Sequence, residues 1–450
     1  MDSTLTIPLH REPVPDAPEA PSVPPLPASL EETGLAEELV AGLVLKALYV
    51  RGAALGFELA DLLALPMTIL DGVIEQLQER RLVEVHSTRG PTRGEYAFRL
   101  TGAGRGRAAE ELEMSRYVGP APVPFEEYLR WVERQAVGRV TVSEAELREG
   151  MHGAVLPDAT LELLGPAINS GSSLFLYGAP GNGKTLVAER IARLFGERYY
   201  VPYAVLVDGS VMIVHDPVHH GDHVPGHRDD VPGPGIADIM RRLPAHDPRY
   251  AEARRPVVVT GGELTLDQLD LQWDPSGRMY QAPPQLKAAG GVLVVDDLGR
   301  QRVPVRDLLN RWVVPLEQRQ DYLTLRSGRK VVVPFDCFVI FSTNLEPRSL
   351  ADEAFLRRIH YKIEVPGPDR AEYERIFRAC CTERDIVFHK DALAYLYDDF
   401  YAGEGVEPRR CHPRDILDHL RDLAGYLGED ACLSPRLLER ACRSYFLPPG

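Results

Sequence analysis

The run SLFLYGAPGNGKT at residues 173–185 constrains the fold of this chain more than any other feature. It is an apolar strand that leads into the pattern G-x-x-x-x-G-K-T, and apolar residues continue beyond it at helical spacing. The glycines let the backbone turn tightly, so successive N–H groups can face a phosphate at the N-terminus of the helix. We therefore predict a phosphate-binding strand, loop and helix, against the alternative of a glycine-rich turn with a solvated lysine.

Two side chains of this loop have specific predicted roles. Lys184 supplies a positive charge to the β- and γ-phosphates of a nucleotide, and the Thr185 hydroxyl suits a Mg²⁺ ligand. We therefore expect ATP and Mg²⁺ as cofactors. The predicted nucleotide-binding residues are Gly178, Ala179, Pro180, Gly181, Asn182, Gly183, Lys184, Thr185 and Leu186.

A second apolar strand, GGVLVVDDL at residues 290–298, ends in two acidic residues. A nucleotide-hydrolysing site needs a carboxylate opposite the phosphate loop. Asp296 is the predicted metal-binding residue, and Asp297 is predicted to orient the attacking water. The alternative is that the two acids merely end a strand.

From about residue 150, apolar strands alternate with helical segments, which is typical of a parallel sheet covered by helices. The predicted strands are SLFLYG, PVVVTG, GVLVVDD and CFVIFSTN. Strand signals stop beyond residue 366, and amphipathic helical segments follow. The predicted fold is an α/β core at 150–366 with a helical lid at 367–450.

These motifs, in this order, resemble those of the AAA+ ATPases. Asn344, at the end of CFVIFSTN, is similar to the sensor-1 residue, which helps to hold the attacking water. The segment DEAFLRRIHYKIEV at 352–365 resembles the MoxR-like segment whose arginine reaches the ATP of the neighbouring subunit. The resemblance implies Arg358 as the arginine finger, with Arg357 as the second candidate.

Three further segments carry the same resemblance. CHPRDILDHL at 411–420 resembles the sensor-2 helix, which makes Arg414 the lid arginine directed at the phosphates. QLKAAGGVLVVDDLGR at 285–300 is similar to a stretch in MoxR-like proteins and in enhancer-binding activators. DYLTLRSGRKVVVPFD at 321–336 is predicted to be a hairpin, and it resembles the insertion that defines the pre-sensor-1 branch of the AAA+ ATPases. In most AAA+ proteins a Glu stands where this chain has Asp297, a difference that bears on the hydrolysis rate.

The N-terminal part divides into three segments. Residues 1–35 are Pro-rich and poor in large apolar side chains, which predicts a disordered tail. Residues 36–117 show three helices, two β-like runs and a closing helix, and they resemble a winged-helix domain. Residues 118–149 are predicted to be a linker with a Pro-rich hinge, GPAPVPF at 119–125, followed by a helix.

The winged-helix-like domain has two alternative uses. As a DNA reader it would place the helix at about 67–80 in the major groove and touch the backbone with Arg89 and Arg93. However, residues 36–117 contain ten Lys plus Arg against twelve Asp plus Glu, whereas a DNA-binding domain usually shows a basic footprint. We therefore favour protein docking, with DNA as the alternative.

Two features of the long segment 199–285 are open. Trp273, Met279 and Tyr280 could grip an extended substrate or simply pack. The histidines of HDPVHHGDHVPGH, residues 215–227, could bind zinc, but a flexible polar loop is favoured because no helix fixes them and no Cys joins them.

Composition narrows the cellular role. The net charge of −15 argues against a protein that mainly coats nucleic acid. The six Cys lack metal-type spacing, and no apolar run approaches the roughly 20 residues that span a bilayer. We therefore expect a cytoplasmic protein without membrane insertion.

The predicted function is an ATP-hydrolysing, hexameric AAA+ motor that remodels a protein partner chosen by the N-terminal domain. The alternatives are a DNA-bound regulator or loader and an ATP-binding scaffold that scarcely hydrolyses.

Overall fold

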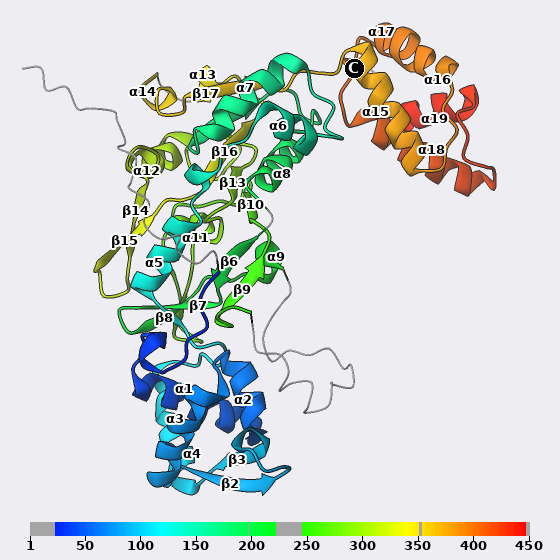
Figure 1. The fold of residues 1–450 in the computed structure, drawn as a ribbon. Helices are drawn as coiled ribbons and strands as arrows, with labels where there is room; N and C mark the ends of the chain where they lie inside the picture. The colour runs from blue at the N-terminus through cyan, green and yellow to red at the C-terminus, as the bar shows by residue number, and fades with distance from the viewer. Residues whose placement is uncertain (1–22, 197, 222–244, 351–352, 447–450) are drawn as a thin grey trace, which may run out of the picture.

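The computed structural model describes residues 23–196, 198–221, 245–350 and 353–446. Its centre is a five-stranded parallel sheet in the order β10-β13-β16-β5-β17 (Figure 1). The strands are β5 (Ser173–Tyr177), β10 (Val257–Thr260), β13 (Val292–Val295), β16 (Phe338–Thr343) and β17 (Tyr361–Glu364). The four strands predicted from the sequence are therefore confirmed, and β17 adds a fifth at the edge.

Both faces of this sheet are buried, which explains why its inner strands are continuous apolar runs rather than alternating ones. Leu174 and Leu176 of β5 pack with helices on one face, whereas Phe175 points to the other face. The first face is covered by α6 (Glu144–Gly150), α7 (Asp158–Asn169) and α8 (Lys184–Leu194). The second is covered by α12 (Val305–Gln318), whose Trp312 is fully buried. This arrangement confirms the predicted α/β P-loop core.

A helical lid with its own apolar core follows the sheet. The lid begins at α15, where Asp369 caps the helix through a hydrogen bond from the Glu372 backbone N–H at 2.7 Å. Arg410 and Glu372, both largely buried, form an ion pair at 2.9 Å within it. Its helices are α15 (Arg370–Glu383), α16 (Lys390–Ala394), the π-helical turn η5 (Tyr395–Phe400), α17 (Tyr401–Glu404), α18 (His412–Leu427) and α19 (Pro435–Tyr445).

The segment between α8 and β13 supplies four strands of a second sheet, in the order β11-β12-β8-β7-β4, and β4 comes from before α5 (Phe125–Arg134). Its strands are β4 (Val123–Pro124), β7 (Ala204–Val207), β8 (Ser210–Ile213), β11 (Gln272–Asp274) and β12 (Met279–Gln281). A two-stranded ribbon of β6 (Tyr199–Pro202) and β9 (Tyr250–Ala253) lies beside it. Tyr280 is buried in the core of this second sheet, and Trp273 packs against that core. Both aromatics therefore have a packing role.

The predicted hairpin at 321–336 is β14 (Gln320–Thr324) paired with β15 (Lys330–Pro334). It does not stand apart from the second sheet. Leu323 and Val333 lie in the same apolar core as Tyr280, and Arg329 pairs with Asp208 at 2.8 Å. The shorter helices nearby are α5 (Phe125–Arg134), α9 (Pro217–His220), α11 (Pro284–Lys287), α13 (Pro347–Leu350) and α14 (Glu353–Leu356).

The N-terminal domain has the predicted order of helices and strands, and β1 (Ala53–Leu55) adds a third strand to its sheet. Figure 1 shows this domain in blue at one end of the molecule, with the second sheet, the parallel sheet and the lid following in turn. Its other elements are α1 (Glu37–Arg51), α2 (Gly56–Leu63), α3 (Met67–Glu79), β2 (Val83–Thr88), β3 (Tyr96–Leu100) and α4 (Gly102–Met114).

Two boundary predictions need correction. The predicted tail 1–35 is wrong for residues 23–35: the backbone N–H of Asp247 donates to Pro24 O at 2.9 Å, and Thr33 is buried. Residues 1–22 lie outside the described part. The predicted hinge at 119–125 is also wrong, because Val123 is fully buried and pairs with Val205 of the second sheet. Both segments are rich in proline, and that composition led to the wrong prediction of a tail and a hinge.

Candidate functional site

The predicted phosphate loop lies between the end of β5 and the start of α8. Gly178, Gly181 and Gly183 all have positive φ, at 136°, 84° and 86°. A Cβ on Gly178 would lie 2.5 Å from Val365 O, so a larger residue would clash with backbone there. Asn182 is buried and its side-chain amide donates to the same Val365 carbonyl at 3.1 Å. The loop is thus fixed against the end of β17.

Lys184 is buried under this loop. Its Nζ donates to the carbonyl oxygens of Gly178 at 2.9 Å and Ala179 at 3.2 Å, and to Asn344 Oδ1 at 2.8 Å. Burial lowers the pKa of Lys184, while the carboxylates of Asp296 and Asp297 oppose that shift. Lys184 therefore lies within electrostatic reach of both predicted acids.

Asp296 and Asp297 follow β13 directly, as predicted. The backbone N–H of Asp296 donates to Thr260 O at 2.8 Å, which fixes this end of the strand against β10. Asp297 has a φ of 48°, in the left-handed region, and its N–H donates to Asp296 Oδ1 at 3.0 Å. The chain turns sharply at Asp297, so the side chains of the two adjacent acids leave the sheet in different directions.

Asn344 connects the basic and the acidic sides of the site. It follows β16, which lies between β5 and β13 in the sheet. Its amide nitrogen donates to Asp297 Oδ1 at 3.2 Å, while its oxygen accepts from Lys184. The carboxyl ends of three neighbouring parallel strands therefore bring Lys184, Asn344 and Asp297 into one hydrogen-bonded chain.

The oxygen donors here fit a magnesium ion. Thr185 lies in the first turn of α8, next to Lys184, and Asp296 has a carboxylate oxygen besides the one that accepts from Asp297. Hydroxyl and carboxylate oxygens are hard ligands of the kind that Mg²⁺ takes alongside phosphate and water. Thr185 and Asp296 could therefore hold the ion with a bound nucleotide.

The two finger candidates differ in their surroundings. Arg358 donates from Nε to Glu317 Oε1 at 2.6 Å, at the C-terminal end of α12. Arg357 is exposed, and within the described ranges no acidic residue forms an ion pair with it. Both lie in the turn after α14. Their role toward another subunit stays a prediction.

The lid places a different arginine near the phosphate loop from the one predicted. Arg414 is exposed and pairs with the neighbouring Asp415 at 2.9 Å. Arg409 instead has its Cδ 3.8 Å from the position that a Cβ on Gly181 would take, and its charge contributes to the lowered pKa of Lys184. The backbone N–H of Cys411 donates to Gly181 O at 2.9 Å, which holds this turn on the loop. The sequence resemblance did not indicate Arg409, and nothing in the sequence marks it beyond its place before α18.

The histidine cluster is only partly described. His223 and His227 lie outside the described residues, whereas His215 and His220 are buried with ring centroids 5.5 Å apart. His220 Nδ1 accepts from the Asp216 N–H at 2.9 Å, and its Nε2 lies 2.9 Å from Lys287 O. Among the residues that the structure describes, no group of three or more His, Cys, Asp or Glu could hold a metal ion.

None of the helices in the described part of the chain is long and apolar enough to span a membrane.

One family model matches part of this chain, and no curated protein matches it. A domain of unknown function, DUF8689, matches residues 369–444 in the lid.

Three solved structures with a similar arrangement are the following. NtrX from Brucella abortus, solved with ATP, is 15% identical with a TM-score of 0.38, covering 69% of this chain and 56% of NtrX. The Thermotoga maritima RuvB Holliday junction branch migration motor is 12% identical with a TM-score of 0.33, covering 67% of this chain and 70% of RuvB. A magnesium chelatase complex of BchI and BchD gives 17% identity and a TM-score of 0.32, covering 64% of this chain and 92% of the matched chain. The match thus spans little more than half of NtrX. The fold of this chain is defined by its own phosphate loop and sheet order, without reference to these structures.

Proposed function

We propose that this chain is a Mg²⁺-dependent ATPase of the AAA+ type that acts as a hexamer and remodels a protein partner. The observation that carries this proposal is the chain of hydrogen bonds from Lys184 through Asn344 to Asp297. It joins a phosphate-binding lysine to an acid that can orient water, at the carboxyl ends of β5, β16 and β13. Such a combination serves phosphoryl transfer to water.

Each residue has a distinct proposed task. The loop N–H groups and Lys184 bind the β- and γ-phosphates, and Asp297 orients the attacking water toward the γ-phosphorus. The new oxygen–phosphorus bond forms as the bond to the β-phosphate oxygen breaks, giving ADP and inorganic phosphate. Asn344 fixes the Asp297 carboxylate, so the acid is positioned before nucleotide arrives. When bound at Thr185 and Asp296, Mg²⁺ would offset the negative charge of the phosphates.

The oligomeric part of the proposal depends on the arginine pair. Arg358, or Arg357 beside it, would complete the site of the adjoining subunit. The Arg358–Glu317 pair is partly exposed, so exchanging Glu317 for a phosphate oxygen would cost little. An arginine supplied in this way stabilises the charge on the transferred phosphoryl group.

The N-terminal domain is proposed to select a protein partner rather than DNA. Arg93, a residue that would touch a DNA backbone, forms an ion pair with Asp71 of α3 and donates to Gln78 Oε1 at 2.9 Å. Its charge is therefore already compensated on the helix that would enter the groove. This contact, together with the acidic balance of the domain, favours docking of a protein.

Phosphate release from purified protein tests the enzymatic part. Wild type should hydrolyse ATP, whereas Lys184→Ala should lose ATP binding and Asp297→Asn should bind ATP without turnover. Asp307→Asn, an exposed acid on α12, is the matched control and should behave as wild type. A wild type that binds ATP but releases no phosphate would overturn the motor and favour a scaffold.

Titration with duplex DNA at two salt concentrations tests the choice of partner. Turnover should stay unchanged by DNA. Strong stimulation that weakens with salt would instead indicate a DNA-bound regulator or loader, because phosphate contacts release counterions.

A further inference from the structure

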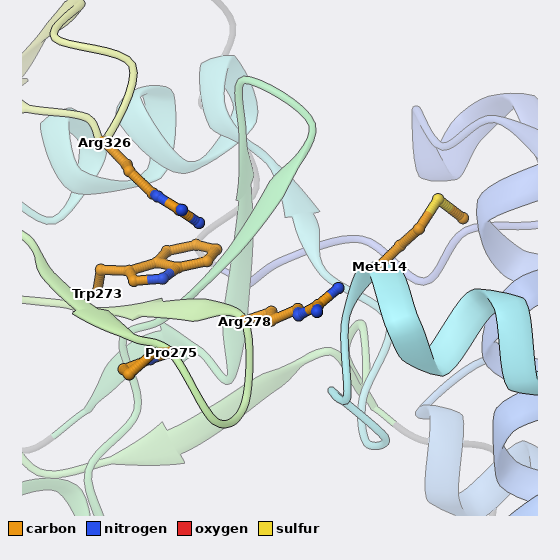
Figure 2. A pocket seen from close by; sticks show the side chains of 5 residues that line it. All are labelled: Met114, Trp273, Pro275, Arg278 and Arg326. Atoms are coloured by element: carbon orange, nitrogen blue, oxygen red, sulfur yellow. The ribbon is translucent and has the colours of Figure 1, made fainter.

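A pocket of about 590 Å³ lies where three parts of the chain meet (Figure 2). Met114 comes from the end of α4 in the N-terminal domain. Trp273 and Arg278 come from β11 and the turn that follows it, and Arg326 comes from the tip of the β14–β15 hairpin. A ligand in this pocket would therefore touch the N-terminal domain, the second sheet and the hairpin of the core at once.

The pocket carries uncompensated positive charge. Arg278 and Arg326 are both exposed, and none of the ion pairs of the described residues involves either. Arg116 is also exposed, and its backbone N–H donates to Gly277 O at 2.9 Å, which brings a third arginine to the same turn. By contrast, Arg329 on the same hairpin is paired with Asp208. In a chain with a net charge of −15, this group of guanidinium ions, which have no carboxylate partner in the described part of the chain, favours an anionic ligand.

The apolar side of the pocket is preformed. Figure 2 shows the Arg326 side chain above the Trp273 ring, and its guanidinium carbon lies 5.2 Å from the ring centroid. Tyr280 packs edge-on against the same indole, with ring centroids 4.9 Å apart. Met114 is 62% exposed and lies across from Arg278. The indole is thus held between Arg326 and Tyr280, and the exposed Met114 lines the pocket on the side of the N-terminal domain.

We propose that this pocket binds an extended acidic peptide segment of the protein partner, an inference that rests on the proposed remodelling function. Carboxylates of the peptide pair with Arg278 and Arg326, whose planar guanidinium groups can each donate two hydrogen bonds to one carboxylate. An apolar side chain between those carboxylates packs against Met114 and the edge of Trp273. Single-stranded nucleic acid fits less well, because Arg326 already covers the ring face on which a base would stack.

Intrinsic fluorescence gives a direct test on the full chain. Of the three tryptophans, Trp131 is 4% exposed and Trp312 is fully buried, so a ligand-dependent signal reports mainly on Trp273. The probe is a short peptide of Asp and Glu with a central leucine, and the comparison peptide has Lys at every acidic position. Lys184→Ala protein without nucleotide is used, so that binding is measured apart from hydrolysis. The acidic peptide should change the fluorescence saturably, and the Lys peptide should not.

Charge-reversed variants locate the site. Arg278→Glu with Arg326→Glu should weaken binding of the acidic peptide by tenfold or more, and the length-preserving Arg278→Gln with Arg326→Gln should weaken it less. Arg440→Glu, an exposed arginine of α19 with no ion pair among the described residues, is the matched control and should bind as wild type. Circular dichroism of each variant checks that the fold is retained.

The following results would overturn the inference. They are the absence of any saturable signal, equal binding by the charge-reversed variants that retain the fold, or an oligothymidylate that binds through the same arginines more tightly than the peptide. Arginine-dependent peptide binding without any ATPase activity in wild type would instead count against the proposed function and leave this pocket assignment standing.

Discussion

The side-chain oxygen of Asn344 lies 2.8 Å from Lys184 Nζ, so the residue that donates to Asp297 also holds the lysine that we propose binds phosphate. Nucleotide must compete for a lysine that already has three hydrogen-bond acceptors. Asn344 loses one contact when Lys184 turns to the phosphates, but its hydrogen bond to Asp297 can remain.

Asn344→Ala should therefore impair turnover much more than ATP binding. Loss of the amide leaves the Asp297 carboxylate without its positioning donor, and we expect phosphate release to fall by about 10²-fold. Steady-state ATPase assays and equilibrium ATP binding separate the two effects. Asn310→Ala, on the exposed side of α12, is the control. Equal losses of affinity and turnover would contradict the positioning role.

Arg409→Ala should weaken ATP binding more than Arg414→Ala. Arg409 lies next to the phosphate loop, and loss of one charge-assisted phosphate contact corresponds to roughly a tenfold to hundredfold weaker Kd. Arg414 is 62% exposed and paired with Asp415, so its removal should cost less than about 1 kcal/mol. Equilibrium dialysis with labelled ATP measures both. If Arg414→Ala weakened ATP binding more than Arg409→Ala, Arg414 would be the lid arginine that contacts the phosphates.

Mixing two inactive variants tests the shared site. Arg358→Ala subunits keep a complete Asp297, and Asp297→Asn subunits keep the arginine. Alternating neighbours therefore rebuild some intact sites, and activity should recover well above that of either variant alone, since an arginine finger is worth about 10³–10⁵ in rate. The same mixture made with Arg357→Ala identifies which arginine acts. Mixtures that stay inactive with both arginine variants would argue against a site shared between subunits.

The Asp247–Arg249 pair should be important for stability. Both side chains are buried, Arg249 Nη2 lies 2.7 Å from Asp247 Oδ2, and Arg249 Nη1 donates to Thr33 O at 2.9 Å. Arg249→Met leaves a buried carboxylate unpaired and should lower the free energy of unfolding by about 3–5 kcal/mol. Urea denaturation followed by circular dichroism measures it. Arg198→Met, which removes an exposed pair with Glu252, should change the midpoint little.

His220 should make the protein sensitive to mild acid. Burial lowers its pKa from 6.5 to about 4, and the neighbouring His215 adds to that shift. Between these two pH values the unfolded chain binds the extra proton, so stability falls as the pH drops from 6.5 to 4. One such histidine contributes a slope of about 1.4 kcal/mol per pH unit. His412, whose pKa burial also lowers to about 4, acts in the same direction in the lid.

Thermal unfolding of wild type and His220→Gln across this pH range checks the prediction. The variant should unfold at a lower temperature at neutral pH, because it cannot reproduce both hydrogen bonds of the imidazole. Its unfolding temperature should then change less between pH 6.5 and 4 than that of wild type. Parallel curves for the two proteins would show that His220 does not contribute to the acid response.

The central sheet was predictable because its signals are local. β5 and β13 are continuous apolar runs. β5 leads directly into the predicted phosphate loop, and β13 leads directly into Asp296 and Asp297. The helices of the lid likewise have clear apolar periodicity. By contrast, β4 has two residues within a proline-rich run, and only Ile363 of β17 is buried. Such short or edge strands depend on pairing with distant segments, which periodicity does not report.

The lid arginine shows a different limit of sequence reasoning. Arg409 and Arg414 lie on either side of the start of α18 and differ in the direction in which that turn faces. The direction is fixed by tertiary contacts, including the hydrogen bond from the Cys411 N–H to Gly181 O. Residue type and spacing identify that an arginine is available, but not which of the two reaches the loop.

The N-terminal domain is fastened at both of its ends, to the segment that leads into β9 and to the second sheet. Before it, Pro24 and Thr33 accept hydrogen bonds from Asp247 and Arg249, and after it, β4 pairs with β7. A domain attached through a single linker could move freely and sample a wide volume in which to bind its target. Two anchors instead make the domain move together with the sheet and the ribbon, so under the proposed function a force on a bound partner would be transmitted directly into the nucleotide-binding core.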